Sequence, residues 1–128
     1  MKLILDTHAF IWLDIAKNRL SATTQEAIQN PQNTLYLSLA SVWEMQLKLQ
    51  LGKLQLNASL ADTLATQHQA NGVELLPIDL KHILALSNLP YHHNDPFDRL
   101  LIAQAQIENF TLITDDAKIR LYDAPISW

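Results

Sequence analysis

The sequence predicts an α/β fold, a three-layer α/β/α sandwich around a central, mainly parallel sheet of four to five strands. The first observation is a series of short apolar runs of strand type, and the second is the helix-like stretches, each of about ten to fifteen residues, that separate them. With 128 residues, 48% of them hydrophobic, the chain can form one continuous core, so we expect a single domain over residues 1–128.

The N-terminal segment predicts a strand at residues 2–6 followed by a helix through THAFIWL. Asp6 stands between the two, where an aspartate is a favourable N-cap. Asp6 and His8 interrupt the apolar run and no small-residue cleavage pattern follows, so we do not interpret it as a signal peptide. No run of about 18 apolar residues predicts a membrane span.

The middle of the chain contains one ambiguous segment. A polar helix is expected from Ser21 to Asn30, stopped by Pro31, and a strand at 34–38. MQLKLQLGKLQL then alternates apolar and polar residues with period two, which favours a strand, although its residues have high helix propensity. The sequence leaves open a helix over 40–51 or a hairpin that turns at Gly52-Lys53.

The C-terminal half repeats the alternation of helices and strands. An amphipathic helix at 59–70 is expected to end at Gly72, and a helix at 79–88 to begin on an aspartate cap. Asp95-Pro96 is a favourable start for the apolar helix that contains LLIAQAQI. The remaining strands are expected at 73–78, 111–114 and 124–128, and a further helix after TLITDD.

Composition excludes several classes of function. The absence of cysteine rules out disulfides and thiolate metal sites, which fits a cytoplasmic protein. The only glycines are Gly52 and Gly72, too few and too far apart for a phosphate-binding loop or a dinucleotide fingerprint. A net charge of -4 argues against binding nucleic acid by bulk electrostatics, so any RNA contact must be local, with Arg99, Lys118 and Arg120 as candidates.

Several acidic residues lie at expected strand ends or helix starts. Asp6 ends the first strand, and Asp115 and Asp116 end the strand at 111–114. Ligands of open parallel sheets bind beyond the carboxyl ends of strands, where the strand order reverses. Asp95 is interpreted as a structural cap, whereas Asp98 opens a helix that must be largely buried and therefore needs a partner, most simply a cation.

Glu44 is the weakest candidate from local pattern alone. Ser41, three residues earlier, is spaced for a capping box, and Lys48, four residues later, for a helical ion pair. If the other acids converge, however, their repulsion is best relieved by a hard divalent cation such as Mg²⁺ or Mn²⁺. His92 and His93 are interpreted as solvated loop residues, since no zinc-binding spacing is present.

The motifs LILDTHAFIW, SVWEMQLKLQLGKL, NDPFDRLLIAQA and LITDDAKI, in this order, resemble those of PIN-domain ribonucleases, most closely VapC-type toxins of type II toxin-antitoxin systems. The resemblance spans essentially the whole chain. It implies a PIN-like sandwich, a helix through SVWE, and a centre of Mg²⁺ or Mn²⁺. The implied catalytic and metal-binding residues are Asp6, Glu44, Asp98 and Asp116, with Thr7, Thr114 and Asp115 supporting them.

The resemblance further implies hydrolysis of RNA phosphodiester bonds, a homodimer, and a cognate antitoxin whose segment crosses the active site. Trp12, Trp43 and Phe10 are candidates to receive that segment, although such residues are more often core. Three alternatives remain open at this point: a flap-type DNA nuclease, a phosphoacceptor signalling module, and a catalytically silent PIN-like binding module.

Overall fold

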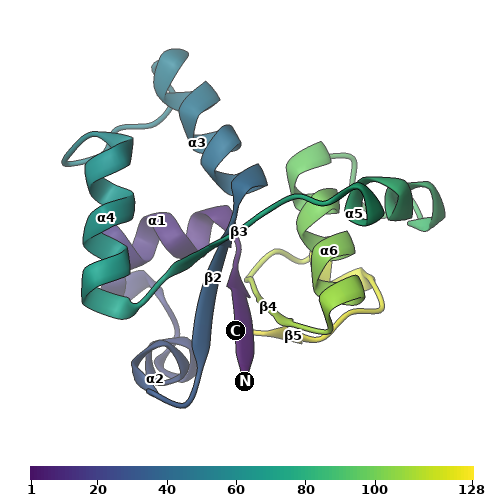
Figure 1. Cartoon of the computed structure of the whole chain (residues 1–128), viewed down its shortest axis with the longest axis horizontal. Coiled ribbons are helices and arrows are strands. Elements are labelled where there is room, and N and C mark those ends of the chain that lie inside the picture. Colours follow the sequence, from purple (N-terminus) through teal and green to yellow (C-terminus); the bar gives the residue numbers. More distant parts are fainter.

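The computed structural model describes all 128 residues and contains one five-stranded sheet in the order β3-β2-β1-β4-β5 (Figure 1). Every pair of neighbouring strands is parallel. The predicted fold class is thereby confirmed. The strands are β1 (Lys2–Leu5), β2 (Thr34–Ser38), β3 (Glu74–Leu76), β4 (Thr111–Ile113) and β5 (Ile126–Ser127).

Six helices and three short 3₁₀ turns connect the strands. No helix combines the length and apolar character needed to cross a membrane. The prediction of a helix after Asp116 is wrong, because the chain there forms only one 3₁₀ turn. The helices are α1 (Thr7–Ile15), α2 (Ala22–Gln29), α3 (Leu39–Gln50), α4 (Leu60–Asn71), α5 (Leu80–Ala85) and α6 (Pro96–Glu108), and the turns are η1 (Lys17–Arg19), η2 (Leu86–Asn88) and η3 (Ile119–Leu121).

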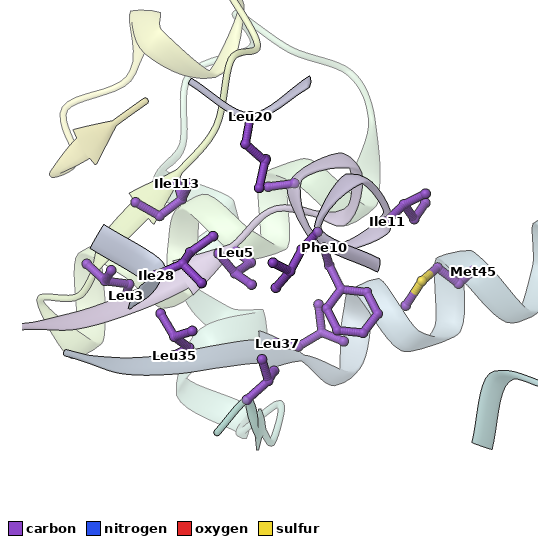
Figure 2. Packing of buried hydrophobic residues seen from close by; sticks show 13 residues of the cluster. Leu3, Leu5, Phe10, Ile11, Leu20, Ile28, Leu35, Leu37, Met45 and Ile113 are labelled. Atoms are coloured by element: carbon purple, nitrogen blue, oxygen red, sulfur yellow. The ribbon is translucent and has the colours of Figure 1, made fainter. Parts of the chain in front are cut away.

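The sheet separates two apolar cores. Because successive strand residues point to opposite faces, Leu3 and Leu5 of β1 enter one core and Ile4 enters the other. The first core is covered by α1, α2 and α4, and Figure 2 shows Leu5 and Leu37 near Phe10 of α1, with Leu3 and Leu35 near Ile28 of α2. The second core is covered by α5 and α6. In α6, residues 100–103 and Ala105 are buried. Helices thus cover both faces of the sheet (Figure 1).

The ambiguous segment is a helix, α3, as the resemblance implied. Its fully buried residues, Ala40, Ser41, Glu44 and Met45, follow helical spacing, whereas the alternating leucines at its end are only partly buried or exposed. The helix begins at Leu39, one residue earlier than expected, and its N-cap is Ser38, whose hydroxyl accepts from the Ala40 N–H at 3.0 Å. The capping box predicted at Ser41 is therefore wrong.

The strand order reverses beside β1, whose neighbours are β2 on one side and β4 on the other. Asp6 follows β1 directly and Thr114 follows β4, and the Asp6 N–H donates to the Ile113 carbonyl at 3.0 Å. The two strand ends that carry aspartates are thus adjacent, as expected at a switch point. This edge of the sheet is where the candidate site lies.

Arg99, expected to contact an RNA backbone, instead anchors the loop before α6. Its side chain is 6% exposed and its guanidinium lies 4.0 Å over the Tyr91 ring. All of its hydrogen-bond partners are neutral oxygens, so the assignment to RNA does not fit. They are the carbonyls of Leu86 (3.3 Å), Leu89 (3.3 Å), Pro90 (2.9 Å) and His93 (3.3 Å) and the Tyr122 hydroxyl (3.2 Å).

We predict that Arg99→Lys lowers the free energy of unfolding by about 3 kcal/mol, because an ammonium cannot satisfy this set of acceptors and stays buried without them. The exposed Arg120→Lys serves as the control and should change stability by less than about 0.5 kcal/mol. Urea unfolding monitored by circular dichroism measures both. Equal stability of the two variants would show that Arg99 has no structural role.

Candidate metal centre

Asp6, Glu44, Asp98 and Asp116, the acids implied by the resemblance, come together at the carboxyl edge of the sheet. They are contributed by the start of α1, the second turn of α3, the first turn of α6 and the turn after β4. The charges of Asp6, Glu44 and Asp116 all act on the Asp98 carboxyl. Acids that are up to 110 residues apart in the sequence thus lie close enough to act on one another.

Asp6 is 5% exposed and caps α1 through one oxygen only. Its Oδ1 accepts from the Ala9 N–H at 2.7 Å. Burial raises the pKa of Asp6, while hydrogen bonds from Thr114 and Ala9 and the nearby charge of His8 act in the opposite direction. Asp6 can therefore cap α1 and also contribute to the site, because the cap uses only one of its two carboxylate oxygens.

Asp98 occupies the first turn of α6, whose N-cap is Asp95. The Asp95 Oδ1 accepts from the Asp98 N–H at 2.9 Å, so Asp95 is the helix cap that the sequence predicted. Burial, the largest cause, and the neighbouring carboxylates of Asp95, Glu44, Asp6 and Asp116 raise the pKa of Asp98 to about 8. Without a cation, this carboxyl is held largely protonated near neutral pH.

The two aspartates after β4 occupy different positions. The Oδ1 of Asp116 accepts from the N–H groups of Lys118 (2.8 Å) and Ile119 (3.1 Å). The Asp116 N–H donates to the Thr114 hydroxyl at 3.1 Å. The second carboxylate oxygen, Oδ2, is not used by the turn and lies 3.7 Å from His93 Nε2. The side chain of Asp115 is 57% exposed and lies 3.5 Å from Arg120. The geometry favours Asp116 over Asp115 as a member of the centre.

Both oxygens of Glu44 already have partners. Oε1 accepts from the Thr7 hydroxyl at 2.7 Å, and Oε2 forms an ion pair with Lys48 at 2.7 Å. Thr7 also lies 2.9 Å from the Ser41 hydroxyl, which helps to fix the carboxylate of this buried glutamate. Glu44 is thus held more rigidly, and more nearly neutralised, than the aspartates.

His93 belongs to the centre, contrary to the interpretation of it as a solvated loop residue. Its Nε2 lies 2.8 Å from Asp98 Oδ2 and 3.7 Å from Asp116 Oδ2, yet it is not aligned for a hydrogen bond and is buried without one. The Asp95 N–H donates to His93 Nδ1 at 3.3 Å. In the neutral ring this places the proton on Nε2, which favours a donor to the carboxylates over a metal ligand.

The donor set fits a hard divalent cation. One carboxylate oxygen each of Asp98 and Asp116 lies within 4.8 Å of the other and of His93 Nε2. Asp116 also lines a neighbouring cleft together with Asp6. Carboxylate oxygens in this arrangement suit Mg²⁺ or Mn²⁺. The raised pKa of Asp98 indicates a site whose negative charge is not balanced by the chain alone.

A second group of potential ligands has a different role. Asp79, His82 and Glu108 also lie within 4.8 Å of one another. Both ring nitrogens of the buried His82 are used, since Nδ1 accepts from the Asp79 N–H and Nε2 contacts Glu108, each at 2.9 Å. This group connects α5 to α6 and has no free nitrogen for an ion.

A cleft of about 250 Å³ opens beside the acids. Asp6 and Asp116 form part of its lining, together with Asp115. Its remaining lining residues are His8, Trp12 and Trp128. The cleft connects the acidic centre to the surface, so a substrate can reach it.

The fold and the centre define an α/β protein with acidic residues gathered at the switch point of a parallel sheet. The sequence profile of the PIN domain matches residues 3–125. The chain therefore belongs to the PIN domain family. No curated protein matches its sequence.

Solved structures share the fold at low sequence identity. VapBC2 from Rickettsia felis, bound to a promoter DNA fragment, has a TM-score of 0.73 and 18% identity, covering 99% of this chain and 98% of that one. VapBC-1 from nontypeable Haemophilus influenzae has a TM-score of 0.66, 21% identity and coverage of 99% and 97%. VapBC-5 from Mycobacterium tuberculosis, described as a toxin-antitoxin system, has a TM-score of 0.60, 18% identity and coverage of 98% and 95%.

The raised pKa of Asp98 predicts a pH-dependent stability in the absence of metal. Between its ordinary pKa of 3.8 and about 8, the folded protein retains a proton that the unfolded chain releases. The contribution of Asp98 to stability is therefore largest at low pH and is lost as the pH rises through this window. Asp98→Asn cannot ionise and should melt at least roughly 4 °C above wild type at pH 8 in EDTA.

Thermal unfolding in EDTA from pH 5 to 8 measures this difference. The exposed Asp123→Asn is the matched control and should follow the wild-type profile. Parallel pH profiles for wild type and Asp98→Asn would mean that Asp98 ionises freely in the folded protein.

Proposed function

We propose that the protein is an endoribonuclease that uses Mg²⁺ or Mn²⁺ to hydrolyse RNA phosphodiester bonds, as the toxin of a toxin-antitoxin pair. The observation that carries the proposal is the convergence of Asp6, Asp98 and Asp116 at the carboxyl edge of the sheet, with the pKa of Asp98 raised to about 8 by burial and by its acidic neighbours. Membership of the PIN domain family and the likeness to VapBC structures support it.

Asp6, Asp98 and Asp116 would hold the ion through oxygens that their caps and turns leave free. When bound, the ion supplies a water of lowered pKa and balances the charge that develops on the phosphate. Glu44, fixed by Thr7 and Lys48, would orient the attacking water or contribute to a second ion. A fixed carboxylate suits this role, because proton transfer requires a defined distance and direction.

Thr7 and Thr114 would support the centre by hydrogen bonds to its acidic residues. Thr7 holds Glu44, and Thr114 contacts both Asp6 and the Asp116 backbone. Asp115, expected in the same supporting role, would act only through its weak pair with Arg120. Such partners orient the carboxylates that bind an ion.

The proposed protein partners are a cognate antitoxin and a second copy of this chain. Trp43 is 59% exposed and meets Phe97 edge-on beside the start of α6, which suits contact with an antitoxin segment. Phe10 is fully buried, so its assignment to that surface is wrong. For the homodimer, support comes from the outer side of α5, where Leu80, Ile83 and Leu84 are 50% to 69% exposed.

We predict that the purified protein cleaves single-stranded RNA with Mn²⁺, and that Asp98→Asn lowers the rate by roughly a hundredfold or more, because the amide removes a charged ligand. EDTA should abolish wild-type cleavage and added Mn²⁺ should restore it. Asp123→Asn is the control. Wild-type activity in the folded Asp98→Asn variant would overturn the assignment of this residue.

The same assay separates the alternative functions. A flap DNA substrate offered in Mn²⁺ tests for a DNA nuclease, and preference for it over RNA would contradict the proposal. A catalytically silent binding module would bind RNA or antitoxin without Mn²⁺-dependent cleavage, which would equally contradict it.

Lys118 and Arg120 remain candidates for the RNA backbone, because both are exposed and follow Asp116 closely. We predict that Lys118→Ala and Arg120→Ala each reduce the slope of log affinity against log salt by roughly 0.7 for single-stranded RNA. Affinity is measured by filter binding, with each variant made in the Asp98→Asn protein so that the RNA is not cleaved. The exposed Lys53→Ala, three residues after α3, is the control and should leave the slope unchanged. Unchanged slopes for both Lys118→Ala and Arg120→Ala would exclude both contacts.

A further inference from the structure

One wall of the cleft beside the acids is aromatic. Trp12 and Trp128 line it together with His8, while Asp6 and Asp116 line its acidic part. A group bound against the tryptophans therefore lies next to any phosphate held at the acidic centre. The cleft combines a planar apolar surface with a polar, charged end.

The positions of the two tryptophans are fixed by the same elements as the acids. Trp12 lies on α1, the helix that Asp6 caps. Trp128 follows β5, which is secured beside the end of β4 by the Thr114 N–H donating to the Ser127 carbonyl at 3.0 Å. The aromatic wall is thus built rigidly onto the carboxyl edge of the sheet.

Neither tryptophan is fully buried, although both pack at the margin of the first core. Their rings meet edge to face, with centroids 5.8 Å apart and planes at 67°. In such a pair, the ring that contributes its edge keeps both faces uncovered by its partner. The pair therefore leaves indole surface available for stacking, apart from the face of Trp12 that lies under Arg19.

Arg19 adds a positive charge to this wall. Its guanidinium lies 4.4 Å from the centre of the Trp12 ring, and the residue is exposed. A guanidinium stacked on an aromatic ring is a common companion of bases in RNA-binding proteins.

We propose that this cleft is a nucleobase subsite, in which Trp12 and Trp128 stack against a base of the single-stranded RNA whose phosphodiester lies at Asp6 and Asp116. The inference rests on the proposed ribonuclease function and deepens it. Because every base offers a planar face, stacking here supplies affinity and register more than a choice of sequence. An acidic peptide would be repelled by the carboxylates, which argues against it as the occupant.

The test combines protein and RNA changes. After the wild-type cleavage site in a short RNA is mapped, each nucleotide around it is replaced in turn by an abasic ribose, and kcat/KM is measured in Mn²⁺. One abasic position should lower kcat/KM for wild type by roughly tenfold to a hundredfold. Trp128→Ala should show a similar loss on intact RNA but no further loss at that abasic position.

Trp12→Leu provides a second variant on the other ring, and circular dichroism establishes that each variant is folded. Trp43→Ala, which removes an exposed tryptophan outside the cleft, is the control and should retain the full abasic effect. Trp128→Phe should recover part of the lost rate, since it restores an aromatic face.

The outcomes separate the two proposals. If wild type does not cleave RNA at all, the proposed function is wrong and the subsite falls with it. If wild type cleaves RNA but both tryptophan variants keep the full abasic effect, the subsite alone is wrong. Loss of antitoxin binding without any effect on RNA cleavage would assign the cleft to a protein partner instead and would overturn the proposal.

Discussion

The mutual repulsion of buried carboxylates is the constraint on which the rest of this structure depends. Asp6 and Glu44 are each 5% exposed, and Asp98 is opposed by four neighbouring acids. The parallel sheet creates this arrangement, because its strand order reverses beside β1 and two aspartate-bearing strand ends become adjacent. The fold therefore concentrates negative charge at one edge, at a cost to stability that a bound cation would relieve.

Local backbone hydrogen bonds fix the positions of the carboxylates while occupying only one oxygen of Asp6 and one of Asp116. Asp6 and Asp116 each use one oxygen to accept from backbone N–H groups, and their caps leave the other oxygen unused. A helix cap and a metal ligand are therefore compatible roles for one carboxylate. Glu44 differs, since Thr7 and Lys48 occupy both of its oxygens, and this separates the group suited to orienting water from those suited to holding an ion.

The local apolar pattern predicted the strands and the α/β class, and the positions of Asp6 and Asp98 marked them as candidates. Glu44, and the choice of Asp116 over Asp115, came only from the resemblance to PIN-domain ribonucleases. The sequence misjudged Arg99 and His93, whose roles are tertiary. Arg99 lies on a helix that is buried over most of its circumference, and this was a signal that a flanking arginine would also be buried. The contacts of His93 with Asp98 and Asp116 depend on how the loop before α6 folds back, which no local pattern specifies. Period two misled at α3 because the leucines that create it are not the residues buried there.

The most direct test of the central claim is the location of a bound ion. Crystals soaked in millimolar MnCl₂, with diffraction data collected at the manganese edge, should give an anomalous peak about 2.0–2.3 Å from carboxylate oxygens of Asp6, Asp98 and Asp116. Occupied Mn²⁺ sites elsewhere, with no peak among these oxygens, would contradict the account.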